Sequence, residues 1–334
     1  MTADANPCRP VVTVVIPSWN TAAATLECLR SLESERPEPS FEVVLVDNAS
    51  PDGTADRVRR EHPEVTVVEH ARNRGFAAAC NAGWRVSRGR LVLFLNSDTT
   101  LGPGALANLV AAMDAESDVG LLGPRLTGRS GALQPSVRSD PTPGALLHQH
   151  TILRHARFLA GCESRYKMRS FGFDRRSDVP VLMGAALLAR REAIEAAGPF
   201  DEGYFMYFEE ADLCRRVRAS GWRVVFDPAP TIRHSGGESR RRAGAEIEVA
   251  YVRSLLRYVA RWEGDHRGRL FAALFLPAWW LRRMDRALRD AIGLVFATAT
   301  GRAEAALRCE RSLVQGLDLL TRRLFEVVRG ATRS

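Results

Sequence analysis

The feature that most constrains the fold of this chain is the alternation of short apolar runs with segments of helical periodicity. Four runs indicate buried strands, because they are apolar, short and bounded by turn residues: Val11–Ile16, Phe41–Val46, Val65–Val68 and Leu91–Leu95. Helical patterns follow them, over Thr21–Ser34, Thr54–His62, Phe76–Val86 and Gly104–Ala115. Strands that alternate with helices predict an α/β fold, with a mostly parallel sheet and helices on both faces.

Polar residues follow three of these strands. They occupy Pro17–Asn20, Asp47–Asp52 and Asn96–Thr99, and ligands of open α/β sheets bind beyond the carboxyl ends of the strands. Two acidic groups at one sheet edge suit a metal-bound diphosphate, since Mg²⁺ is held by one or two carboxylates together with substrate phosphates. Taken alone, Asp47 is equally explained as a turn residue that hydrogen-bonds its own backbone.

The helix predicted to begin at Glu209 carries an acid on its apolar side. At about 100° per residue, Glu210 lies roughly 13° from the centre of the apolar stripe, Glu209 roughly 87° and Asp212 roughly 147°. Asp212 is therefore expected to face outwards, towards Arg215 or Arg216. Acids at a helix start favour the macrodipole, but a carboxylate that points inward costs energy unless it is paired or used. Glu210 is therefore the candidate general base.

The second half of the α/β region gives weaker signals. Val181–Ala189, Trp222–Phe226 and Thr231–His234 are predicted strands, whereas residues 125–178 are less regular and predict a binding loop or disorder. A lone histidine is more often structural than a ligand. His234 becomes a candidate ligand for Mn²⁺, or a partner for phosphate, if Asp98 lies nearby.

The chain is predicted to be entirely helical from about residue 243. The apolar run Leu270–Leu281 is too short to span a membrane, which takes about 20 residues, and it contains Pro277. Two alternatives stay open for this run. It is either a buried helix or an interfacial segment that places Trp279 and Trp280 at the level of lipid headgroups.

Composition limits the remaining function classes. The net charge of +8, from 47 basic and 39 acidic residues, attracts phosphates, nucleic acids or anionic lipids without choosing between them. Six cysteines without a Cys-x-x-Cys pair argue against a zinc ribbon or disulfide scaffold and fit a reducing compartment. A P-loop motif is absent, and Gly102–Ala107 matches a dinucleotide motif only weakly.

Six motifs stand in an order that resembles a known family. They are VTVVIPSWN, VVLVDNASPDGT, ARNRGFAAACNAG, FLNSDTT, MGAALLARREAIEAAGPFDEGYFMYFEEADLCRRVRASGW and HSGG, all within residues 10–240. This part of the chain resembles glycosyltransferase family 2, the inverting enzymes with a GT-A fold. It is most similar to the bacterial rhamnosyltransferases of cell-wall and O-antigen assembly.

The resemblance implies a role for each matching residue. The nucleotide-contacting residues would be Pro17, Ser18, Asn20, Asp47, Asn73, Arg74, Gly75, Asn96 and Ser97. Asp47 would accept the N3–H of a uracil or thymine ring. Asp98, with His234, would bind Mg²⁺ or Mn²⁺, although Asn96 replaces the first aspartate of the family's D-x-D motif. Met183, Gly184 and Ala185 would line the acceptor or donor-sugar side, and Glu210, or its neighbour Glu209, would be the base.

The resemblance also implies an activity. Residues 10–240 would form the catalytic domain, with a nucleotide-sugar half over 10–124 and an acceptor half over 125–240. Residues 1–9 are expected to be disordered, and 241–334 to form a helical region that associates with a membrane or a second subunit. The enzyme would transfer a sugar, with dTDP-rhamnose as the leading donor and a UDP-sugar as the alternative, to a polyprenyl-linked or cell-surface glycan.

A location and a set of partners follow from this activity. The protein is expected in the cytoplasm, peripheral on the inner face of the membrane. Nucleic acid is not an expected partner, because it would explain the basic charge but not the acidic strand ends. A noncatalytic scaffold that binds nucleotide-sugars or glycans is the alternative from a different class. It would be favoured if Glu210 could be replaced without loss.

Overall fold

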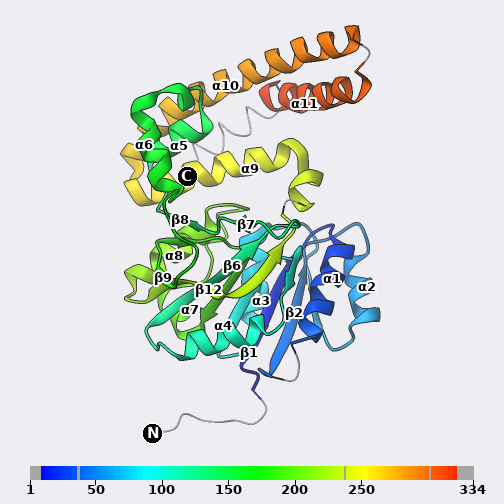
Figure 1. Ribbon diagram of the computed structural model, residues 1–334, viewed down its shortest axis with the longest axis vertical. Coiled ribbons are helices and arrows are strands. Elements are labelled where there is room, and N and C mark those ends of the chain that lie inside the picture. Colours follow the sequence, from blue (N-terminus) through cyan, green and yellow to red (C-terminus); the bar gives the residue numbers. More distant parts are fainter. Residues whose placement is uncertain (1–8, 36–37, 237, 301, 322–334) are drawn as a thin grey trace. The chain divides into compact units, whose positions relative to one another are not determined.

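The computed structural model describes residues 9–35, 38–236, 238–300 and 302–321 (Figure 1). It divides into two compact units. Unit 1 comprises the described residues of Met1–Asp140, Ser170–Phe205 and Glu209–Ser239, and unit 2 those of Pro141–Arg169, Met206–Phe208 and Arg240–Ser334. Unit 2 thus takes in a segment that the sequence assigns to the acceptor half. Apart from Arg9, the predicted disordered terminus lies outside the described residues.

Unit 1 contains the strands and six of the described helices. Its strands are β1 (Val12–Ser18), β2 (Phe41–Asp47), β3 (Thr66–Glu69), β4 (Leu91–Leu95), β5 (Thr99–Leu101), β6 (Val119–Thr127), β7 (Leu133–Gln134), β8 (Val137–Arg138), β9 (Ser177–Asp178), β10 (Val181–Leu182), β11 (Ala186–Arg190) and β12 (Arg223–His234). Its helices are α1 (Ala22–Glu33), α2 (Thr54–Glu61), α3 (Phe76–Val86), α4 (Ala105–Asp114), α7 (Arg191–Ala197) and α8 (Glu209–Ala219).

The main sheet has the order β3-β2-β1-β4-β11-β6-β12-β5. Strands β3, β2, β1 and β4 run parallel, β11 is antiparallel to both β4 and β6, and β12 is parallel to β6. The predicted α/β fold, with a mostly parallel sheet, is therefore confirmed. Figure 1 follows the order of the elements by colour, from the blue β1 to the yellow-green β12.

Helices cover both faces of the sheet at β1. Every residue of β1 is buried, as in central parallel strands. Val12, Val14 and Ile16 belong to one core cluster that also includes apolar residues of α1 and α4. Val15 points to the opposite face, where its side chain lies directly against Gly83 of α3. Gly83 is needed there because a Cβ atom would overlap the Val15 side chain.

Two predicted strand segments differ from the structure. The run Val181–Ala189 is divided into β10, which pairs with β8, and β11, which pairs with β4, so the chain changes sheets over residues 183–185. The two strands predicted over 222–234 are instead one strand, β12, with an irregularity between Asp227 and Thr231. Pro228 and Pro230 lie there, and proline cannot donate a hydrogen bond to the ladder.

The prediction of a binding loop or disorder over residues 125–178 is wrong for much of this range. Unit 2 begins here with α5 (Pro143–His150), a 3₁₀ helix η1 (Ile152–His155) and α6 (Arg157–Tyr166). Pro143 occupies the first turn of α5, where a missing N–H costs nothing, and Thr142 caps the helix by accepting from the Ala145 amide. Pro143 thus helps to start a helix within the segment predicted to be irregular.

The remaining described part of unit 2 is helical, as predicted. It consists of α9 (Glu238–Glu263), α10 (Asp265–Ala299) and α11 (Ala303–Thr321). Gly264, at φ +88°, separates α9 from α10, and the next turn brings Gly268 against the backbone of Ala260. None of the described helices is long and apolar enough to cross a membrane.

The sequence left Leu270–Leu281 open as either a buried helix or an interfacial segment. In α10 one face of this run is buried and the other is exposed. Phe271, Phe275 and Trp279 are buried, whereas Leu270 and Leu281 are more than half exposed. The expectation that Trp279 reaches lipid headgroups is wrong, because its side chain is only 2% exposed.

Candidate functional site

The carboxyl ends of β1, β2 and β4 form one edge of the sheet in unit 1. Ser18, at the end of β1, is in register with Asp47, at the end of β2. The Ser18 hydroxyl lies 3.1 Å from that of Thr21, which in turn lies 3.0 Å from the hydroxyl of Ser97, just after β4. Hydrogen bonds between hydroxyls thus join the first and third predicted nucleotide segments. Pro17 lies within β1, in register with Val46.

Asp47 is buried at this edge. Its Oδ2 accepts a hydrogen bond from the Ser50 amide at 3.2 Å, as expected of a turn residue, but its Oδ1 is buried and has no hydrogen-bond partner in the part of the chain that the structure describes. Because buried polar atoms are nearly always satisfied in the functioning molecule, this oxygen is suited to a ligand N–H. Asn20, at φ +56°, is fixed nearby by its amide, which donates to the Ser50 hydroxyl at 2.9 Å.

Asn48 holds Asn73–Gly75, which are also predicted to contact the nucleotide, against the segment that follows β2. Its Nδ2 donates to the Gly75 carbonyl at 3.0 Å and its Oδ1 accepts from the Arg74 amide at 3.2 Å. The Asn73 side chain closes the same turn by accepting from the Gly75 amide at 2.9 Å. Sequence reasoning gave Asn48 no separate role, although its position directly after Asp47 was the available signal.

Arg74, one of the predicted nucleotide contacts, forms an ion pair within unit 1. Its guanidinium lies 2.9 Å from Glu202, which also pairs with Arg85 at 2.8 Å and accepts from Asn81 Nδ2 at 3.1 Å. Burial alone would raise the pKa of Glu202. The hydrogen bonds from Asn81 and Arg85 and the positive charges of Arg85 and Arg74 outweigh it and lower this pKa. Arg74 would have to leave Glu202 to reach a phosphate.

The predicted metal ligands come together. His234 Nε2 lies 3.3 Å from Asp98 Oδ1 and 3.4 Å from Asn96 Nδ2. The pairing of β12 with β5 produces this contact, because it places His234 in register with Thr99. His234 Nδ1 lies 3.0 Å from Gln134 Oε1, which turns Nε2 towards Asp98. Gln134 was missed by sequence reasoning, since it comes from the short strand β7 in a segment without a recognisable pattern.

The segment Met183–Ala185 also reaches this edge. Since β11 is antiparallel to β4, its start lies beside the end of β4, and the Asn96 amide donates to the Ala185 carbonyl at 2.9 Å. A Cβ atom on Gly184 would lie 3.5 Å from the Glu210 Cβ atom. The half-buried Glu210 therefore packs its side-chain stem against the segment that borders Asn96.

Glu209 and Glu210 occupy different surroundings. Glu209 is 5% exposed, and its Oε2 has no hydrogen-bond partner among the described residues. Burial, reinforced by the charge of Glu210, raises the pKa of Glu209 well above its usual range. The helical-wheel prediction that Glu210 is the more inward of the two is therefore wrong, because α8 is covered on more sides than its apolar stripe indicates.

The prediction that Asp212 faces outwards is also wrong. Asp212 is fully buried, and its Oδ2 accepts from Arg216 Nε at 2.8 Å, so the expected partner is found but on the inner side. Arg216 also donates to the carbonyls of Ala197 and Gly198 at 2.6 Å each. This buried ion pair fixes α8 to the end of α7. The two residues before α8, Tyr207 and Phe208, have positive φ angles of 72° and 67°, which bulky side chains rarely adopt.

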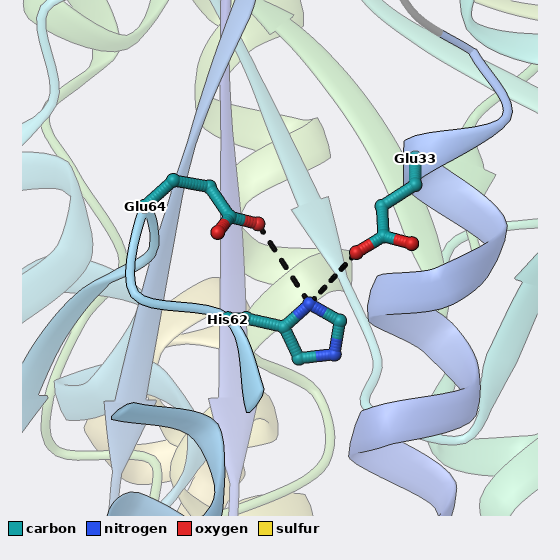
Figure 2. Close-up of side chains that lie close together, drawn as sticks. All are labelled: Glu33, His62 and Glu64. Atoms are coloured by element: carbon teal, nitrogen blue, oxygen red, sulfur yellow. Dashed lines mark ion pairs between the residues drawn. The ribbon is translucent and has the colours of Figure 1, made fainter. Parts of the chain in front are cut away.

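A second cluster of potential ligands lies elsewhere in unit 1. Figure 2 shows His62 Nδ1 between two carboxylates, 2.9 Å from Glu33 and 3.7 Å from Glu64. Glu33 ends α1 and His62 follows α2, so the cluster lies a helix length, about 18 Å, from Thr21 and the site edge. These ion pairs account for the cluster as a link between the ends of the two helices.

The fold and the residues at this edge define a sugar-nucleotide-dependent transferase of the GT-A type. The model of Glycosyl transferase family 2 matches residues 13–197, which is more than half of the chain. The chain belongs to this family and is a glycosyltransferase.

Curated relatives act on different acceptors. The chain is 29% identical, over 79% of its own length and 84% of the relative's, to the N-acetylglucosaminyl-diphospho-decaprenol L-rhamnosyltransferase of Mycobacterium tuberculosis. It is 28% identical to the pre-mycofactocin glycosyltransferase of the same organism, over 94% of this chain and 62% of that one.

Solved structures share the fold. One is a mannosyltransferase from Pyrobaculum calidifontis in complex with GDP-Man and Mn²⁺, with a TM-score of 0.54 and 22% identity over 97% of this chain and 87% of that one. Another is GalNAc-T7 with UDP, GalNAc and Mn²⁺, with a TM-score of 0.52 and 16% identity over 69% of this chain and 44% of that one.

Replacing Gly75 with alanine should destabilise unit 1. Gly75 has φ +87° and ψ 174°, a region essentially restricted to glycine, and a Cβ atom there would overlap the carbonyl of Phe205. We expect Gly75→Ala to lower the free energy of unfolding by about 2–5 kcal/mol, measured by denaturant titration. Gly53→Ala is the matched control, because Gly53 also has positive φ but a Cβ atom on it would meet no other atom within 4 Å. Equal losses in the two variants would contradict the close packing of Gly75 on Phe205.

Replacing Glu209 with glutamine should stabilise the protein increasingly as the pH rises. The raised pKa means that folded Glu209 keeps its proton above pH 4.5, where the unfolded carboxyl loses it, so the wild type loses stability above this pH. Glu209→Gln removes that loss. We expect the difference in melting temperature, variant minus wild type, to be larger at about pH 7.5 than at about pH 4.5. A difference that does not change with pH would show that Glu209 is not held protonated by burial.

Proposed function

We propose that this glycosyltransferase transfers L-rhamnose from dTDP-rhamnose to a hydroxyl of a polyprenyl-diphosphate-linked glycan. The observation that carries the choice of sugar and acceptor is the similarity to the mycobacterial rhamnosyltransferase, which extends over most of both chains. The geometry of unit 1 supports the chemistry, because the predicted nucleotide, metal and base residues border one edge of the sheet.

Asp47 would recognise the base of the nucleotide. Its buried Oδ1 is an acceptor with no hydrogen-bond partner among the described residues, and thymine and uracil both present an N3–H donor. Beside it, the backbone of Asn73–Gly75 is held by Asn48 and would lie along the nucleotide. Leaving Asp47 Oδ1 unsatisfied costs about 1–3 kcal/mol, which a bound base would recover.

Asp98 and His234 would hold a divalent cation, Mg²⁺ or Mn²⁺. The donor set fits such an ion, because a carboxylate oxygen and an imidazole nitrogen lie 3.3 Å apart with the Asn96 amide beside them. Gln134 would act as a positioning residue, since a hydrogen bond at Nδ1 fixes the ring orientation of a ligating histidine. When bound, the ion supplies positive charge next to the diphosphate of the donor.

Glu210 would be the general base. It is half-buried against Gly184 at the sheet edge. Burial raises the pKa of Glu209, which favours its protonated form, and a protonated carboxyl group cannot accept the proton of the acceptor. The acceptor hydroxyl attacks the anomeric carbon and passes its proton to the Glu210 carboxylate. The bond from that carbon to the diphosphate oxygen breaks, and the nucleoside diphosphate leaves. A single displacement inverts the configuration at the anomeric carbon.

The lipid carrier of the proposed acceptor sets the location. A polyprenyl diphosphate is anchored in a membrane, so we place the enzyme on the cytoplasmic face of the cytoplasmic membrane, as a peripheral protein.

Thermal-shift titration with dTDP, UDP and GDP, each with and without Mn²⁺, tests the donor class. A ligand that binds only the folded state raises its stability by RT ln(1 + [L]/Kd). We expect the largest shift with dTDP, and only with the metal present. A larger shift with UDP would move the donor to a UDP-sugar while leaving the fold and the chemistry unchanged. A shift that is equal without metal would contradict the roles of Asp98 and His234.

Glu210→Gln separates the chemical step from donor binding. We expect this variant to keep the metal-dependent shift with dTDP but to lose at least about 100-fold in transfer rate, since a general base contributes 10²–10⁴-fold. Glu209→Gln is the matched control and should keep most of the transfer rate. If Glu210→Gln keeps a near-normal transfer rate and Glu209→Gln loses it, Glu209 is the general base and Glu210 is not. Full turnover by both variants would contradict carboxylate catalysis at this position.

A further inference from the structure

Helix α10 of unit 2 carries an apolar stripe on its exposed side. The α10 stripe consists of Leu270, Leu274, Leu281, Met284, Leu288, Ile292 and Val295, whose side chains are 44% to 70% exposed. At about 100° per residue, all seven project within roughly 40° of the direction of Leu270, along about 38 Å of helix. Pro277, which is also exposed, falls within the same band.

The opposite side of α10 is the side that packs. Phe275 and Trp279 lie roughly 140–180° around the helix from Leu270, and both are buried within unit 2. The α10 stripe is therefore not needed for the core. Seven large apolar side chains in one exposed row form a patch of the kind that marks an interaction surface.

The charge of the chain is concentrated in the same region. Residues 241–334 contain 18 arginines and 10 acidic residues, a net +8, whereas residues 1–240 contain 29 basic and 29 acidic residues. The entire formal net charge thus belongs to the segment that holds α9, α10 and α11. On α10 itself, Arg267 and Arg289 have exposed side chains that flank the stripe, roughly 60° and 100° around the helix from Leu270.

From this combination, we propose that α10 lies flat on an anionic membrane surface, with the α10 stripe inserted among the lipid chains. A straight apolar row on a basic helix is the pattern of an interfacial helix, and no described helix is long and apolar enough to span the bilayer. The arginines add electrostatic attraction to anionic headgroups.

A second copy of the chain fits this surface less well. Two copies would bring together two regions that each carry a net +8. A coiled-coil seam along the stripe would also place Pro277 in its middle. Coiled-coil partners are selected by oppositely charged pairs beside the seam, and neighbours such as Ala278 and Ala291 do not provide them. The membrane proposal depends on α10 alone. It can therefore fail while the proposed glycosyl transfer is correct, and the proposed glycosyl transfer can fail while the membrane proposal is correct.

Sedimentation of the full chain with phosphatidylcholine vesicles, with and without phosphatidylglycerol, tests the proposal. We expect binding to the anionic vesicles that weakens with added salt. The double variant Leu288→Glu/Ile292→Glu should bind at least about 10-fold more weakly, since burial of one such side chain is worth this factor or more. Arg267→Gln, at an exposed position roughly 60° from the direction of Leu270, should weaken binding about 5-fold. Val86→Glu, at an exposed apolar position of α3 in unit 1, is the matched control and should bind normally.

Three results would overturn the proposal: no binding by the wild type, equal binding by the stripe variant, or salt-independent binding to neutral vesicles. A concentration-dependent dimer that the stripe substitutions dissociate would assign the surface to a second copy instead, and this would also overturn it. The melting temperature of each variant and its shift with dTDP and Mn²⁺ report on folding and donor binding separately. A stripe variant that keeps both while losing vesicles supports the membrane role alone.

Discussion

The site depends on one constraint, the parallel register of a strand that is buried on both faces. Every residue of β1 is enclosed, by the core shared with α1 and α4 on one side and by α3 on the other. A shift of one residue would exchange its two faces and move Val15 into the position of Val14 or Ile16. The register that avoids this also places Ser18 beside Asp47. Burial of apolar side chains thus sets the position of the nucleotide edge before any polar contact forms.

Buried polar contacts then position the segments that the strand register does not, namely the Asn73–Gly75 turn and α8. Asn48 makes two hydrogen bonds to the Asn73–Gly75 turn and a third to His70, and so ties that turn to the sheet edge. The Asp212–Arg216 pair ties α8 to the turn after α7. Such groups are costly to leave unpaired inside a protein, so each favours one arrangement of the segments that it joins. The same reasoning accounts for Glu209. Its burial beside Glu210 stores an unfavourable interaction at the start of α8, of the kind that persists at functional sites.

The sequence predicted the parts of this structure that follow from local pattern. The first four strands and the helices between them could be placed because their apolar runs are continuous and their turns contain Gly, Pro or Asn. The meeting of Asp98 with His234 followed from the family resemblance rather than from periodicity. The helical wheel of α8 misplaced Asp212 because it assumes one buried face, whereas packing on several sides encloses an acid whenever an arginine can reach it. Gln134 was missed since its place beside His234 is decided by a contact between residues 100 positions apart. Helix α5 was missed although Thr142 and Pro143 form a local helix start.

The distribution of charge along the chain distinguishes long-range electrostatic attraction from short-range coordination. The residues of unit 1 comprise 23 basic and 28 acidic residues, a formal net charge of −5, so an anionic donor is not drawn to unit 1 by a long-range field of its own. Recognition of the diphosphate must then come from groups in direct contact, which is consistent with a site that brings a carboxylate and an imidazole together to share a cation. The net charge of +8 lies instead in the helical segment, where exposed arginines and an apolar row occur on one helix. With the two proposals made above, long-range attraction would act on an extended anionic surface, and short-range coordination would act on the nucleotide.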